Sequence, residues 1–413
     1  MNKTELDCLK RELAVTLIRY GVNIKSPKIV EVISVVDDIQ FTNMVVEELY
    51  KTGVKRVLVN WVSSSTARLH YLYGDKKVLT DFFPYELDKF HYHAFHYIPR
   101  VFIESEYFDA LEGTDFNKVS YVISKQQEEA YRYIDKVFDA HWTGCFIPNK
   151  NWAKKLFPKL KEEDALNKAW KVFLKVTRVE KNKTLNNWKN HLNDLKKKGN
   201  YLTKLHIDKL TYKNKLGTNL TIGLTDNPRF VGGVHLSNYT HREYNPNFPT
   251  EEVFTTPHRL KADGVVYSSK PLCVKGELIE GIKMVFRKGK IVEAYAKKNQ
   301  AILRTLIKQD KDACYLGEVA LVPYSSLINH ALPLFYSTIF DENACCHLAF
   351  GTAFEIGYLH HEKFSKKQLI AKGLNLASNT HIDFMIGTSD LSIIATTKDK
   401  KKITIFKNGE WAI

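Results

Sequence analysis

Two kinds of hydrophobic pattern alternate along the first 150 residues of the chain. Apolar residues at helical spacing predict a helix over residues 5–20, and we expect it to end at Gly21 because glycine is a common helix C-cap. A second helical segment ends near Gly53, and a third is expected near 124–140. Runs of β-branched residues between these helices predict strands at 29–36, 56–62 and 101–104. Apolar strands separated by helices are typical of a parallel sheet covered by helices, so the first half is predicted to be Rossmann-like α/β.

The second half has a different pattern, rich in short strands and turns. The segment 282–294 predicts a hairpin that turns at Lys288-Gly289, and a helix is expected near 298–308. Further strands are expected at 220–224, 231–234 and 264–267. The predicted fold is therefore an α/β domain over residues 1–200 and a β-rich α+β catalytic domain over residues 201–413. Two domains also suit the length of 413 residues, which exceeds the size of most single cores.

The net charge of +15 is concentrated in one interval. Residues 150–215 contain 19 Lys or Arg and 6 Asp or Glu, which gives 19 − 6 = +13. The apolar residues in this interval are spaced as in helices, especially over 150–200, so we interpret the lysines as solvated helix faces. The alternative, a nucleic-acid-binding protein, would require steeply salt-dependent oligonucleotide binding, and no nucleic-acid-binding motif accompanies the charge. Nucleic acid is therefore an unlikely partner.

Several other features limit the classes of function. The six cysteines are scattered at spacings that fit neither a zinc ribbon nor a redox motif, so reduced thiols are expected. No run of about 18 apolar residues and no leader-like start is present, which predicts a cytoplasmic protein without a membrane partner. No glycine-rich phosphate-binding loop follows the strands. The histidines at 91, 93 and 96 have no carboxylate or cysteine nearby in the sequence, so we expect a packed amphipathic segment there.

Candidate chemistry is confined to the second half of the chain. Glu318 lies in an apolar run, where an ionised carboxylate needs a partner charge or a metal ion to offset its desolvation. His381 and Asp383 are two residues apart, so on a strand both project from one face and can chelate one ion. A structural salt bridge is the alternative for each residue taken singly. The full set of candidate ligands is Glu252, Glu318, His347, His381 and Asp383.

The residues around His347 are expected to form a helix, whose geometry predicts which side chains lie on the same face. On a helix, Phe354 shares the face of His347, and Tyr358 lies one turn further on. Glu342 is then about 140° round the helix from His347, so it can join the same site only if a turn intervenes or if it lies behind the ligands.

Four ordered motifs, together with weaker similarity along the whole chain, resemble the thermophilic metallo-aminopeptidase family, also called the aminopeptidase T, S and PepS family. The motifs are 250–259 (TEEVFTTPHR), 317–323 (GEVALVP), 340–351 (FDENACCHLAFG) and 381–387 (HIDFMIG). The resemblance implies a dinuclear exopeptidase that removes amino-terminal residues from short peptides, with Glu252, Glu318, His347, His381 and Asp383 as metal ligands. Oxygen and imidazole ligands suit zinc, cobalt, manganese or magnesium. A homodimer is also implied, and Glu342 or Glu251 is a candidate general base.

One position departs from the family in a way that bears on activity. The family carries a tyrosine seven residues after the motif histidine, whereas this chain has Phe354, which lacks the hydroxyl. Tyr358 is a candidate catalytic residue that could substitute for this hydroxyl. The second hypothesis is therefore a catalytically impaired member that acts as a peptide-binding or scaffold protein.

Overall fold

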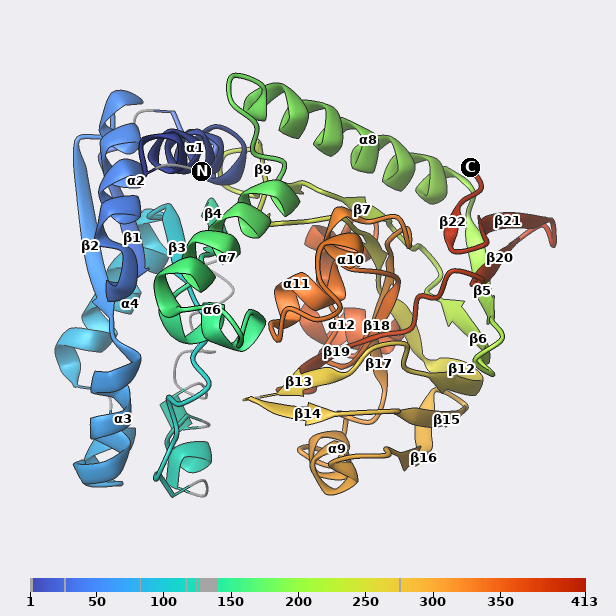
Figure 1. Ribbon diagram of the computed structural model, residues 1–413. Helices are drawn as coiled ribbons and strands as arrows, with labels where there is room; N and C mark the ends of the chain where they lie inside the picture. The colour runs from blue at the N-terminus through green and yellow to red at the C-terminus, as the bar shows by residue number, and fades with distance from the viewer. Residues whose placement is uncertain are drawn as a thin grey trace. The chain divides into compact units, whose positions relative to one another are not determined.

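The chain forms two compact units. The computed structural model describes residues 3–25, 27–81, 83–115, 118–123, 125–126, 140–274 and 276–413. The first unit comprises residues 1–189 and 234–248, and the second comprises residues 190–233 and 249–413 (Figure 1). Residues 234–248 lie beyond the predicted boundary near 200 but belong with the first unit. They do so because a short strand in this segment joins the first unit's sheet.

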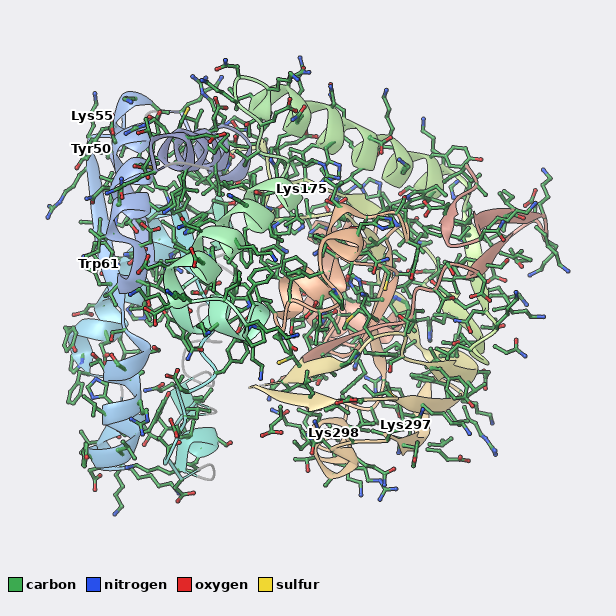
Figure 2. All side chains as sticks on the ribbon, viewed as in Figure 1. Tyr50, Lys55, Trp61, Lys175, Lys297 and Lys298 are labelled. Carbon is green, nitrogen blue, oxygen red and sulfur yellow. The ribbon has the colours of Figure 1, made fainter. Side chains whose placement is uncertain are left out.

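The first unit contains the parallel sheet that the sequence predicts. Its five strands are all parallel, in the spatial order β2-β1-β3-β4-β10, which is one of the two common orders of doubly wound α/β folds. The edge strand β2 leaves Trp61 exposed (Figure 2). The bounds are β1 Ile29–Val35, β2 Arg56–Val62, β3 Arg100–Glu104, β4 Trp142–Phe146 and β10 Asn247–Phe248, and a separate two-stranded ribbon joins β8 His235–Leu236 to β9 Glu243–Tyr244.

Helices of the first unit pack apolar faces inward and expose their lysines. In α7 the buried side chains include Trp170 and Phe173, whereas Lys168, Lys171 and Lys175 are exposed, as expected for a solvated face. The bounds are α1 Lys3–Thr16, α2 Ile39–Lys51, α3 Ser64–Tyr73, α4 Pro84–His96, α6 Lys150–Leu156, α7 Glu162–Val176 and α8 Thr184–Lys204. The division between the two units falls within α8. Single 3-10 turns occur at Val36–Asp38 and Val78–Thr80. The helix expected near 124–140 lies almost entirely outside the described residues.

The expectation that the first helix ends at Gly21 is wrong. The helix continues as a π-helical turn over Leu17–Val22, and Asn23 in the left-handed conformation ends it. Glycine occurs at position 21 for a packing reason, because a Cβ there would lie 2.7 Å from the hydroxyl oxygen of Thr143 on β4. Tertiary contact, rather than helix capping, therefore explains this glycine.

The second unit consists mainly of antiparallel sheet, as its sequence predicts. An eight-stranded sheet has the order β16-β15-β12-β6-β5-β20-β21-β22, and a five-stranded sheet has the order β19-β18-β17-β11-β7. The large sheet is formed by β5 Ile207–Lys213, β6 Asn219–Leu224, β12 Pro257–Tyr267, β15 Lys283–Arg287, β16 Lys290–Tyr295, β20 Ser392–Thr397, β21 Lys402–Lys407 and β22 Glu410–Trp411. The smaller sheet is formed by β7 Val231–Gly232, β11 Val253–Thr255, β17 Leu316–Leu321, β18 His347–Gly351 and β19 His381–Met385, and β13 Leu272–Val274 pairs with β14 Glu277–Ile279.

Short helices join these strands. The expected hairpin is confirmed, with Lys288 and Gly289 both at positive φ in the turn between β15 and β16. The helix α11 lies against β19 (Figure 1). The helices are α9 Gln300–Ile307, α10 Leu327–Ala331, α11 Thr338–Glu342 and α12 Lys366–Ala371, with 3-10 turns at Glu355–Gly357 and His361–Lys363. All six cysteines are described and none forms a disulfide. Among the described helices, none has the length and apolar character needed to cross a bilayer.

The histidine-rich segment forms the amphipathic helix α4, and its buried histidine contacts a buried carboxylate. Glu31 on β1 lies 2.9 Å from the Lys89 ammonium, 3.0 Å from His93 Nδ1 and 3.2 Å from Arg100 Nε. Asn60 on the adjacent strand also donates to Glu31. Burial by itself raises the pKa of Glu31, but the contacts with His93 and Lys89 outweigh it and lower the pKa to about 2.

The low pKa of Glu31 predicts a specific pH dependence of stability. Its folded-state pKa is below the unfolded value of 4.5, so the ion pairs contribute stability above pH 4.5 that is lost as the pH falls toward 2. At pH 7 we expect Glu31→Gln to lower the free energy of unfolding by roughly 3 kcal/mol, because Arg100 and Lys89 lose their buried partner. Urea unfolding at pH 7, 5, 4 and 3 measures this difference, which should shrink in acid. Glu47→Gln, on the exposed pair with Arg11, is the control, and a difference independent of pH would contradict the interpretation.

Candidate metal centre

The five-stranded sheet of the second unit has one apolar face and one face that carries the candidate ligands. Side chains alternate along each strand, so Val319 and Leu321 on β17 and Leu348 and Phe350 on β18 point away from the ligands. These four residues, with Val253 and Phe384, belong to the main hydrophobic core of the unit. The opposite face of the same strands is therefore the only place where the polar residues of the motifs can project.

The register of the strands gathers the candidate ligands on that face. Glu318 on β17 and Asp383 on β19 are both paired with Ala349 on β18, and residues directly opposite in an antiparallel sheet share a face. His381 is paired with Gly351, two residues further along β18, and lies on the same face as Asp383. The expectation that His381 and Asp383 project together from a strand is therefore confirmed.

Small side chains between the ligands keep this face open. His347 is opposite Ala320, whereas Ala349 lies between Glu318 and Asp383. At Gly351 φ is +105°, and a Cβ there would lie 2.1 Å from the Thr380 carbonyl oxygen. The sequence thus surrounds its buried carboxylates with residues too small to fill the space above the sheet.

Six polar side chains form three overlapping groups within this space. In each group one ligand atom from every residue lies within 4.8 Å of the others. His347 Nε2 is 3.2 Å from Glu252 Oε2 and 3.7 Å from Glu318 Oε1. His381 Nε2 is 3.5 Å from Glu318 Oε2 and 3.3 Å from Asp383 Oδ1. The groups are Glu252, Glu318 and His347; Glu318, His381 and Asp383; and Glu342, His347 and Asp383.

The electrostatics of the cluster show a shortage of positive charge. Burial and the Glu318 carboxylate raise the pKa of Glu252, and burial and Asp383 raise the pKa of Glu342 well above its usual value. For Glu318, burial is outweighed by the approach of His347 and His381, which lowers its pKa to about 2. Four carboxylates therefore face two imidazoles, and bound protons or divalent cations must compensate their charge.

Two local observations fit a metal ion in place of those protons. His381 donates Nδ1–H to the Thr352 carbonyl oxygen at 2.8 Å, so Nε2 faces the carboxylates with its lone pair available. Glu252 Oε2 is buried, and His347 Nε2 lies 3.2 Å from it. A ligand imidazole oriented from behind and a buried carboxylate oxygen that faces another imidazole are features of divalent-metal sites.

The helical interpretation of the segment after His347 is wrong. Residues 347–351 form the strand β18, which pairs with β17 and β19, and Phe354 precedes a 3-10 turn. Phe354 nevertheless lies beside the cluster, with its ring centroid 4.9 Å from that of His381 and 5.9 Å from that of Phe254. A turn separates α11 from β18, and this turn brings Glu342 within reach of His347 and Asp383.

Tyr358 is not brought to the cluster. Its ring is buried in a separate apolar group with Leu369 and Leu374, and its hydroxyl interacts with Lys372 and Asp226. Phe354 and Tyr358 would share a face only on an α-helix. The residues between them form a 3-10 turn instead, so the two side chains do not project together.

The sequence analysis missed a buried residue that links two of the candidate carboxylates. Asn343 Oδ1 accepts a hydrogen bond from the backbone N–H of Glu251 at 2.7 Å, which fixes the chain beside Glu252. Its Nδ2 donates to the Ile339 carbonyl oxygen at 2.8 Å and to Glu342 Oε1 at 3.3 Å. Asn343 lies within the 340–351 motif, so the motif was the available signal, but its role depends on the distant 250–252 segment.

A buried cluster of carboxylates and imidazoles on a sheet is typical of a divalent-metal site, and comparisons with known proteins identify the class of protein that carries it. The family model for thermophilic metalloprotease (M29) matches residues 8–411. Aminopeptidase AmpS of Bacillus subtilis (strain 168) is 36% identical over 398 residues, covering 96% of each chain. Aminopeptidase T of Thermus thermophilus is 32% identical over 418 residues, covering 99% of this chain and 100% of the relative.

A solved structure agrees with these sequence matches. Wild-type AmpT from Thermus thermophilus superimposes with a TM-score of 0.88 at 30% identity and covers 98% of this chain and 99% of its own. The chain belongs to the thermophilic metalloprotease family M29. The expected enzyme class, a metallo-aminopeptidase, and the use of divalent metal are thereby confirmed.

We expect Asn343 to position the carboxylates without binding metal itself. Asn343→Ala leaves the buried Glu251 N–H without its acceptor, which costs about 1–3 kcal/mol of stability. Asn343→Asp keeps that acceptor but removes the donor to Glu342. Urea unfolding and zinc affinity, measured by calorimetry, separate the two effects. The control is Asn329→Ala, which removes an Nδ2 donor from the Tyr324 carbonyl oxygen elsewhere in the unit. Equal zinc affinities in all four proteins would show that Asn343 is only a packing residue.

Proposed function

We propose that this protein removes amino-terminal residues from short peptides with water activated at a two-ion centre. The proposed ligands are Glu252, Glu318, His347, His381 and Asp383. Their convergence on one sheet face, within the distances given above, supports this assignment. The printed names of the relatives as aminopeptidases support the reaction.

The geometry of Glu318 is the observation that carries the two-ion proposal. Its Oε1 faces His347 and its Oε2 faces His381, so one carboxylate belongs to two of the ligand groups. Glu318 would therefore hold one ion together with Glu252 and His347 and a second ion together with His381 and Asp383. Bound divalent ions supply a more acidic water and polarise the scissile carbonyl.

Other residues of the chain perform the remaining steps. Glu342 reaches the cluster from α11 with Oε1 held by Asn343, so we propose that it accepts the proton of the attacking water. Glu342 is half-buried, between the other carboxylates and the surface. Glu251, the other candidate base, is buried, and its backbone N–H is hydrogen-bonded to Asn343, so we assign it to positioning the adjacent Glu252.

An apolar surface adjoins the polar cluster on the same face. Phe354 is 42% exposed beside His381, and Phe254 packs with Val231, Ala320 and Ile356. This surface suits contact with an uncharged part of a peptide. Phe354 occupies the region of the family tyrosine but offers no hydroxyl there, which is why the impaired-enzyme alternative needs a direct test.

Assembly, metal identity and location stay predictions. Zinc, cobalt, manganese and magnesium all suit the oxygen and imidazole donors. A homodimer is expected from the resemblance to the family, and large apolar side chains exposed on the first unit are candidate contacts for it. These side chains are Tyr50, Trp61, Val62, Leu69 and Tyr73, of which the first two can be followed in Figure 2. A cytoplasmic location and short peptides as substrates remain part of the proposal.

Metal binding and hydrolysis should depend together on Glu318. We expect the wild-type chain to bind about two divalent ions and to hydrolyse peptides with a free amino terminus but not amino-blocked ones. Chelation should abolish this activity. Glu318→Gln should lower metal content and reduce kcat/KM at least about 100-fold, since even the residues that orient metal ligands are worth 10- to 100-fold. Elemental analysis and a peptide panel measure both.

The matched control is Glu293→Gln, which makes the same chemical change on exposed β16. This variant should keep the wild-type metal content and rate. A folded, metal-loaded wild-type chain that is inert towards the whole peptide panel would rule out the proposed reaction. Equal hydrolysis of blocked and free peptides would rule out an exopeptidase.

Phe354→Tyr distinguishes an active enzyme from an impaired one. The added hydroxyl lies beside His381, where it can stabilise developing charge, so we expect kcat to rise about tenfold or more from a measurable wild-type value. Phe95→Tyr, on the exposed face of α4, is the control. If the metal-loaded wild-type chain has no turnover and only the tyrosine variant does, the scaffold alternative is correct.

A further inference from the structure

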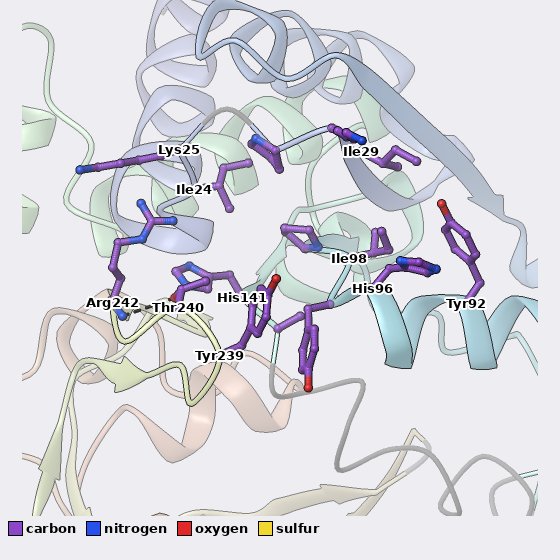
Figure 3. Close-up of a pocket in the computed structure, with 15 residues that line it drawn as sticks. Ile24, Lys25, Ile29, Tyr92, His96, Ile98, His141, Tyr239, Thr240 and Arg242 are labelled. Carbon is purple, nitrogen blue, oxygen red and sulfur yellow. Dashed lines mark hydrogen bonds between the residues drawn. The ribbon is translucent and has the colours of Figure 1, made fainter.

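The first unit contains a cavity that has no part in the proposed reaction. It has a volume of about 360 Å3, at the lower end of the range of about 300–1000 Å3 that is typical of small-molecule sites. The cavity lies at the amino ends of β1, β3 and β4, where it is lined by Ile29, Pro99 and His141. Ligands of open α/β sheets usually bind at the other end, outside the carboxyl ends of the strands. Figure 3 shows the cavity between α4 and the segment around Tyr239.

The lining of this cavity is positively charged. Lys25, Lys28 and Arg242 contribute to it, and none of its described lining residues is an aspartate or glutamate. A lining that carries three cationic side chains and no carboxylate among its described residues favours anions. The guanidinium of Arg242 in particular offers paired donors that match phosphate or carboxylate oxygens.

Arg242 has a donor left over for such a ligand. Its Nη1 is buried and has no hydrogen-bond partner in the described part of the chain. The surrounding residues hold the segment in place: His141 Nδ1–H donates to the Val22 carbonyl oxygen at 2.6 Å, and its Nε2 accepts from the Thr240 hydroxyl. The Arg242 backbone N–H in turn contacts the Thr240 hydroxyl at 3.4 Å. Burial and the nearby Arg242 lower the pKa of His141, so this histidine is a neutral support and not part of the charge.

Aromatic rings form another part of the lining. Tyr97 and Tyr239 stack with centroids 3.9 Å apart and planes 6° from parallel. Tyr239 is 57% exposed, so its ring can also contact a ligand. Tyr92 and His96 on α4 provide two more rings, with centroids 4.3 Å apart. Stacked, partly exposed rings beside a cationic group favour a ligand with both a planar ring system and an anionic group.

We propose that this cavity binds a nucleoside monophosphate, with the phosphate on Arg242 and Lys28 and the base against the tyrosine rings. The volume suits one ring system with one anionic group. No glycine-rich loop is involved, so recognition rests on the side chains alone. The proposal is independent of the peptidase centre and does not require the enzyme to be active.

Titration calorimetry of the full-length chain at fixed ionic strength tests this site. The probes are adenosine monophosphate, adenosine and inorganic phosphate. We expect the monophosphate to bind at least tenfold more tightly than either fragment. Arg242→Gln should weaken its binding about tenfold or more, because a charge-assisted hydrogen bond is lost. Tyr239→Leu should weaken it about fivefold or more and leave phosphate binding unchanged.

Lys175→Gln provides the matched control for charge, since it removes one exposed cation of α7 outside the cavity (Figure 2). Its affinity for the monophosphate should equal that of the wild type. Lys28→Gln on the exposed rim replaces Arg242→Gln if the latter does not fold. Equal affinities for the monophosphate and inorganic phosphate, an unchanged affinity in the cation variants, or no binding at millimolar concentration would each overturn the proposal.

Discussion

The second unit depends on one constraint, which is that several ionisable groups must be buried on one side of a sheet whose other side is the hydrophobic core. Leu348 and Phe350 point into the core from the same strand that presents His347. Because side chains alternate, shifting this strand by one residue would bury the imidazole in the core and expose the apolar side chains to the carboxylates. The core therefore fixes the register of the ligands, and its packing stabilises an arrangement that is electrostatically unfavourable by itself.

This coupling explains which parts of the structure could be predicted from the sequence. The strand that carries His381 and Asp383 and the hairpin at Lys288-Gly289 are specified by local alternation and by turn residues, and both were predicted correctly. The segment after His347 is a short apolar run, whose periodicity is compatible with helix or strand. Only its pairing with β17 and β19, which are distant in sequence, decides for a strand. The same limit applies to Gly21, where a contact with Thr143 explains the residue.

For the candidate site, the sequence indicated the candidate ligands more readily than the residues that hold those ligands in position. Glu252, Glu318, His347, His381 and Asp383 could be named because buried carboxylates and paired polar groups are conspicuous in apolar strands, and because the motifs resemble a family. Asn343 could not be assigned a role, since an asparagine at a helix end has many ordinary functions. Its bonds to Glu251 and Glu342 exist only after two segments about 90 residues apart have met.

Histidines in the two units show that neighbouring charges decide whether burial succeeds in lowering the pKa of an imidazole. Burial disfavours the charged form of His141, His347 and His381 alike. Burial and the nearby Arg242 lower the pKa of His141, whereas the carboxylates around His347 and His381 outweigh burial and raise the pKa of both well above the usual range. A divalent ion competes directly with the protons that these two imidazoles would otherwise hold, so metal affinity at the cluster must rise with pH. His141 has no such competition, because its two ring nitrogens are already bound to Val22 and Thr240, and it can serve only as a rigid support.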